Sequence, residues 1–162
     1  MQLSTLCAEI ERLVENDGGP EAALASAIES IARAFGAATA TLHRSDGTET
    51  ILKLVSARGV PPAVLSLIQD IPFGKGMAGI CAERRAPVTV CNLQRDGSGV
   101  VRPGAKETGV AGAIVVPVLS ASGERVIGTL GVGKPGEHEY TEEERTALER
   151  CASIIRPLLE RI

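Results

Sequence analysis

Two segments in which a strand, a turn and a second strand follow one another place the strongest constraint on how this chain folds. Residues 38–43 form a predicted strand, and residues 51–57 return as its partner after a turn rich in polar residues and glycine. Residues 111–119 and 125–133 repeat this arrangement. Strands joined by short turns pair antiparallel, so the sequence predicts an antiparallel sheet.

Predicted helices at both ends of the chain complete an α+β fold. Apolar residues recur there at helical spacing, and Thr141 with Glu144 forms a capping box that opens the last helix. Helices are predicted at 3–16, 20–35, 62–68, 77–83 and from 141 onward, and one further strand at 87–91. The 162 residues contain no linker or repeat. Residues 1–162 are therefore expected to form one domain.

The core must be built from aliphatic residues, because the chain has no Trp, one Tyr and two Phe. Few aromatic faces are left for stacking a base or a flat cofactor. The net charge is −3 and the basic residues form no run, which argues against a nucleic-acid partner. No apolar run approaches the ~18 residues of a membrane span, and no signal peptide pattern opens the chain. We expect a cytoplasmic protein with no membrane partner.

The sequence G-x-G-x-x-G occurs at Gly74, Gly76 and Gly79. As a dinucleotide fingerprint it would need a strand before it, a helix after it and an acidic residue about 20 positions on. A helix rather than a strand is predicted upstream, and Pro72 interrupts the residues just before the first glycine. The nearest later acidic residue, Asp96, lies in a predicted loop. We therefore predict a tight turn that leads into a helix, where glycines allow positive φ and close backbone approach.

Residues 92–110 form a long predicted loop that contains five glycines or prolines and several charged side chains. A loop of this length inside a compact domain is usually functional or disordered. Gly128, Gly131 and Gly133 fall inside a predicted strand, where glycine is unfavourable unless something packs closely against the backbone.

The order of elements, together with residues 71–76, 113–118 and 126–132, resembles the GAF domain family over nearly the whole chain. The resemblance implies an antiparallel sheet of five or six strands, with helices from both termini packed on one face. It also implies a small-molecule pocket on the other face. The glycine motif would start the helix that walls this pocket, and the loop 92–110 would fold over its mouth.

Residues 71–76 are also similar to the corresponding string of free methionine-R-sulfoxide reductase, a GAF enzyme. That enzyme carries cysteines where this chain has Ile68 and Ala78, and another in the loop, which here contains none. A nucleophilic and a resolving thiol are the whole of that chemistry. Cys81 and Cys91 could form a substitute pair, although two buried, inert thiols are the favoured interpretation.

Other GAF activities lack their residues in this chain. The residue set by which cyclic-nucleotide-binding members resemble one another cannot be placed here. Neither His43 nor His138 neighbours a cysteine, as a bilin-bearing member would require, and both are expected to be surface or hairpin-end histidines. No C-x-x-C spacing supports a zinc site. No cofactor or metal is assigned.

We expect a non-catalytic sensory or signalling module that binds a small polar or anionic ligand. Backbone N–H groups at the helix start could hold an oxyanion. The expected ligand contacts are Gly76, Met77, Ala78, Gly79, Asn92, Arg95, Arg102 and Lys106. Apolar faces on the terminal helices predict a homodimer, and a signalling protein is a further expected partner. The alternative is a divergent thiol-dependent enzyme of the methionine sulfoxide reductase type, and a purely structural domain with an empty pocket is a third possibility.

Overall fold

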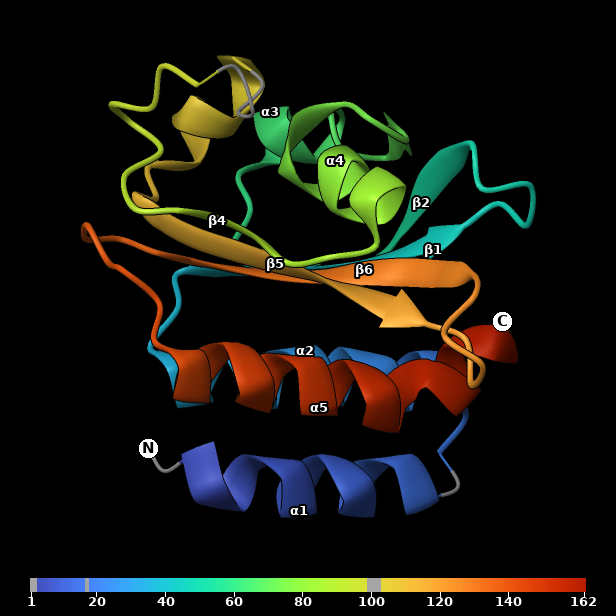
Figure 1. The fold of residues 1–162 in the computed structure, drawn as a ribbon. Coiled ribbons are helices and arrows are strands. Elements are labelled where there is room, and N and C mark those ends of the chain that lie inside the picture. Colours follow the sequence, from blue (N-terminus) through green and yellow to red (C-terminus); the bar gives the residue numbers. More distant parts are fainter. Residues whose placement is uncertain (1–2, 17, 99–102) are drawn as a thin grey trace.

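A six-stranded antiparallel sheet organises the molecule (Figure 1). The computed structural model describes residues 3–16, 18–98 and 103–162. The spatial strand order is β3-β2-β1-β6-β5-β4, so the two predicted hairpins, β1–β2 and β5–β6, meet at the centre through β1 and β6. The strands are β1 (Thr39–Ser45), β2 (Ile51–Arg58), β3 (Asp70–Pro72), β4 (Val88–Val90), β5 (Gly112–Leu119) and β6 (Val126–Lys134).

Helices cover both faces of this sheet. The long helices α2 and α5 pack on one face, and α1 stacks beneath them, while the short elements α3, α4 and η1 lie on the other face (Figure 1). The expected α+β arrangement is confirmed. The helices are α1 (Leu3–Glu15), α2 (Pro20–Phe35), α3 (Pro62–Leu65), α4 (Gly76–Arg84) and α5 (Glu142–Glu160), with the 3-10 helix η1 (Pro103–Thr108). No helix of the described residues is both long and apolar enough to cross a membrane.

Local sequence explains where the long helices begin and end. Pro20 occupies the first turn of α2, where its missing N–H group costs nothing. Gly36 ends that helix in the left-handed conformation, with φ of 60°. The predicted capping box opens α5, because Thr141 Oγ1 accepts from the Glu144 N–H and Glu144 Oε1 accepts from the Thr141 N–H.

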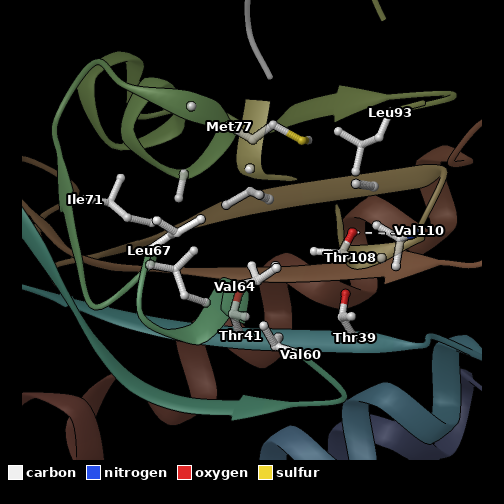
Figure 2. A pocket seen from close by; sticks show the side chains of 18 of the residues that line it. Thr39, Thr41, Val60, Val64, Leu67, Ile71, Met77, Leu93, Thr108 and Val110 are labelled. Carbon is white, nitrogen blue, oxygen red and sulfur yellow. Dashed lines mark hydrogen bonds between the residues drawn. The ribbon is translucent and has the colours of Figure 1, made fainter. Parts of the chain in front are cut away.

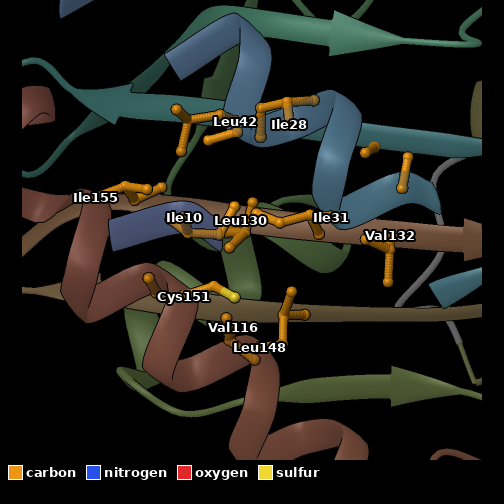
Figure 3. Packing of buried hydrophobic residues seen from close by; sticks show 14 of the residues in the cluster. Ile10, Ile28, Ile31, Leu42, Val116, Leu130, Val132, Leu148, Cys151 and Ile155 are labelled. Atoms are coloured by element: carbon orange, nitrogen blue, oxygen red, sulfur yellow. The ribbon is translucent and has the colours of Figure 1, made fainter. Parts of the chain in front are cut away.

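The main core lies between the sheet and the helices α2 and α5 (Figure 3). Leu42, Val116 and Leu130 point from the central strands into this layer, where they meet residues such as Ile28 and Ile155. All five side chains are fully buried. Each buried side chain of this size stabilises the fold by about 1.5–3 kcal/mol relative to an exposed one. The aliphatic composition is therefore sufficient for a packed core.

The glycine motif forms the expected turn before α4. Gly74 and Gly76 have φ of 87° and 65°, and the Gly74 N–H donates to the Gly79 carbonyl over 2.7 Å. The segment before the motif differs from the prediction. The helix predicted at 62–68 ends at Leu65, and a short strand, β3, precedes the motif. Pro72 is tolerated there because β3 is the edge strand of the sheet.

A substitution at Gly79 tests whether the glycine motif is needed for close packing. A Cβ atom at this position would collide with the Pro72 carbonyl oxygen. Gly79→Ala should lower the free energy of unfolding by about 2 kcal/mol, although Ala ordinarily favours a helix. Gly97→Ala is the control, since its Cβ would meet nothing within 4 Å, and its effect should stay within about 0.5 kcal/mol. Equal urea midpoints for the two variants would contradict the packing role.

Candidate functional site: a pocket on the face opposite the long helices

A pocket of about 280 Å³ lies on the sheet face opposite α2 and α5 (Figure 2). Its floor is formed by β1, β5 and β6, and its walls by α3, the start of α4, and the segments around Leu93 and η1. The lining is mostly apolar. The lining residues with polar side chains are Thr39, Thr41, His43, Lys75 and Thr108.

Strand alternation and two glycines create the space above the floor. Thr39 and Thr41 of β1 face the pocket, and their partners across the strand pair are Gly133 and Gly131 of β6. A Cβ atom at Gly133 would lie 2.7 Å from Thr39 Oγ1, and one at Gly131 would lie 3.2 Å from Val115 Cγ2. The unfavourable glycines of this strand therefore leave room that side chains would fill.

Leu93, Gly104, Thr108 and Val110, which belong to the described parts of the predicted loop, line one side of the pocket. Gln94 connects these parts, because Nε2 donates to the carbonyl oxygens of Lys106 and Val110 over 3.0 and 2.8 Å. Gly104 of η1 approaches Leu67, whose Cδ1 would lie 2.8 Å from a Cβ atom at that glycine. Leu67 is 49% exposed and marks the pocket mouth.

His43 lies in the floor and is not the surface histidine that we expected. It is only 2% exposed, and its Nε2 donates to the Ile68 carbonyl oxygen over 2.9 Å. Burial lowers the pKa of His43, and the hydrogen bond to Ile68 opposes only part of this effect. The prediction was wrong because α3 and the segment that follows it cover the strand from above.

The predicted contact residues separate into two groups. Gly76, Met77 and Ala78 line the pocket at the start of α4, a helix without a side-chain cap. Gly79 lies further along the helix and is buried against Pro72. Asn92 lies outside the lining and donates from Nδ2 to Glu137 Oε1 over 3.3 Å.

The predicted basic contacts are not part of the described lining. Arg95 and Lys106 are exposed and do not line the pocket formed by the described residues, and Arg102 lies outside those residues. Their role in ligand binding remains a prediction. Sequence reasoning missed the residues of β1 that face the pocket, Thr39, Thr41 and His43. The period-two pattern of that strand, set opposite a strand rich in glycine, is the signal that could have indicated them.

Two of the four cysteines, Cys81 and Cys151, are buried. Cys81 is fully buried, and desolvation together with the charge of Glu149 raises the pKa of its thiol to about 12. Burial also raises the pKa of Cys151. Cys91 is exposed, which corrects the expectation that it would be buried like Cys81. No group of three or more His, Cys, Asp or Glu among residues 3–16, 18–98 and 103–162 could hold a metal ion.

Thiol labelling of the folded protein distinguishes these environments. At pH 8 we expect Cys91 to react fast, whereas Cys81 and Cys151 should react only after unfolding, because the thiolate is the reactive form. Mass spectrometry of labelled peptides measures each site. Cys91→Ser should remove the fast phase, and Cys81→Ser should leave it unchanged. Fast labelling of Cys81 in the native protein would revive the thiol-enzyme alternative.

Comparison with known proteins identifies the fold. The sequence model of the GAF domain family matches residues 19–160 of this chain. No curated protein matches the chain in sequence.

Among solved structures, the chain is similar to the free methionine-R-sulfoxide reductase from Neisseria meningitidis, solved in complex with its substrate. The TM-score is 0.80 and the identity 23%, over 98% of this chain and 88% of the other. It is also similar to the GAF domain of a phosphoenolpyruvate-protein phosphotransferase from Coxiella burnetii. The TM-score there is 0.82 and the identity 20%, over 98% and 93%. At these identities the likeness concerns the fold alone.

Proposed function

Because the chain belongs to the GAF domain family, we propose that it is a non-catalytic sensory module that binds a small molecule in the pocket between its sheet and α3, α4 and η1. The observation that carries this proposal is the pocket itself. Its apolar walls, its volume of about 280 Å³ and the glycines that hold its floor open are features of a ligand site rather than of a packed core.

The lining favours a ligand with an apolar body. Residues such as Val64, Leu67 and Val110 surround most of the space (Figure 2). A polar or acidic group of the ligand, as the sequence predicts, would lie at the start of α4. Uncapped N–H groups and the positive end of the helix favour negative charge there, and the exposed Lys75 lies beside them.

No observation favours the thiol-dependent enzyme. A thiolate is required for that chemistry, and the buried Cys81 has a pKa raised to about 12. The exposed Cys91 lies outside the pocket lining formed by the described residues. The reductase of Neisseria meningitidis supports the proposal only in that its fold, which this chain shares, accommodates a small substrate.

Filling the pocket tests the proposal. Val115 is half-buried and lines the pocket, so Val115→Phe would place its added atoms in the ligand space. Native mass spectrometry of the gently purified protein, followed by a small-molecule screen, should show one bound molecule per chain for the wild type and at least tenfold weaker binding for this variant. The control is Val14→Phe, at a half-buried valine of α1 away from the pocket. Binding that survives Val115→Phe unchanged would contradict the proposal.

The output of such a module passes through contact with another signalling protein or with a second copy. The apolar residues predicted to pair two copies are largely covered within one chain, since Leu6, Ile10 and Leu148 are fully buried. Half-buried residues of α1, such as Leu3 and Leu13, are the apolar groups that a partner could still reach. They support a homodimer through α1 as part of the proposal.

Sedimentation velocity at micromolar concentration measures the association. We expect a dimer for the wild type and a monomer for Leu13→Arg, because a charge placed at a buried apolar contact disfavours pairing. Leu67→Arg is the matched control, since this exposed leucine lies at the pocket mouth. A monomeric wild type would refute the dimer.

A further inference from the structure

His43 contributes a hydrogen-bond acceptor to the pocket floor that nothing in the described protein uses. The side chain lines the pocket and is 2% exposed. Its Nε2 atom lies 2.9 Å from the Ile68 carbonyl oxygen. A carbonyl oxygen can only accept, so Nε2 carries the proton. The ring orientation and tautomer are thereby fixed by the protein.

The other ring nitrogen, Nδ1, has no partner in the described part of the chain. Among the described residues, no group forms a hydrogen bond with the buried Nδ1 atom of His43. Burial lowers the pKa of the ring, which therefore stays neutral near pH 7 and leaves Nδ1 with a bare lone pair. A buried acceptor without a donor is unfavourable by roughly 1–3 kcal/mol, so such an atom needs an explanation.

Two further buried polar atoms lack partners among the described residues, Ser45 Oγ and Thr129 Oγ1. Thr129 is the residue opposite His43 on β6, and Ser45 follows two positions along β1, so all three lie on the same sheet face. Only His43 lines the pocket. His43 is therefore the one of the three whose side chain borders the space that a bound molecule would occupy.

We propose that His43 selects ligands which bear an N–H or O–H donor on an apolar body, and that this donor binds Nδ1 at the pocket floor. The proposal rests on the ligand-binding function proposed above and specifies its ligand class. Thr39 and Thr41 also line the pocket, but a hydroxyl can donate or accept and so selects neither kind of group. A lone pair held in place by the protein accepts a donor and repels a carboxylate.

The pocket volume limits the apolar body. A cavity of about 150 Å³ holds benzene, so a pocket of about 280 Å³ holds a ligand of roughly a dozen non-hydrogen atoms by proportion. Indole and benzofuran fit this space and have nearly the same shape. They differ in that indole has an N–H donor and benzofuran has an ether oxygen.

Calorimetric titration of the full chain with these two probes at pH 7.5 tests the selection. We expect the wild type to bind indole about tenfold more tightly than benzofuran. His43→Phe keeps the ring volume and removes the acceptor, so it should bind the two probes equally. His138→Phe is the matched control and should keep the preference, because His138 lies outside the lining and contacts Glu144.

Nitrogen NMR of the wild type gives an answer that needs no variant to fold. The chain has two histidines, so ¹⁵N-histidine labelling yields two ring systems. Indole should shift the His43 Nδ1 resonance, benzofuran should not, and His138 should respond to neither. Equal affinity for both probes with an unmoved Nδ1 signal would overturn the selection by His43 and leave the ligand-binding pocket standing. No binding of either probe at millimolar concentration would overturn both.

Discussion

The strict alternation of side chains along β1 and β6 is the constraint on which the rest of this molecule depends. Leu42 and Leu130 point to the helices and fill the core, whereas Thr41 and Gly131 point the other way and shape the pocket. A slip of one residue in register would exchange the two faces. It would bury threonines in the main core and place leucines in the pocket. The same periodicity thus supports both the stability of the fold and the existence of the site.

Much of the fold could be predicted because its signals are local. The two hairpins, the long terminal helices and the capping box at Thr141 are encoded in short stretches of sequence, and the structure confirms them. Gly74, Gly76 and Gly79 also behave as predicted, since two adopt positive φ and the third allows a carbonyl to approach. The strand β3 could not be predicted, because three residues are too few to show a period.

The candidate site could be predicted only in part, for a physical reason. The start of α4 was found because a glycine motif marks it. His43 and Thr41 were not found, because their surroundings are made by segments distant in sequence. Ile68 comes to within 2.9 Å of His43 from 25 residues away. Whether a strand residue faces solvent or a pocket depends on what covers it. The exposure of Cys91 depends on tertiary structure in the same way.

The sheet is only one strand layer thick between the pocket and the long helices, and this has a mechanical consequence. A Cβ atom at Gly128 would collide with the His43 carbonyl oxygen and lie 2.9 Å from Leu159 Cδ2 of α5. The backbone beneath the pocket floor is therefore in close packing with the last turns of α5. Protein interiors are as densely packed as crystals of small organic molecules, so this region cannot readily absorb a displacement. Any displacement of the His43 backbone would therefore act, through one peptide layer, on the end of the C-terminal helix.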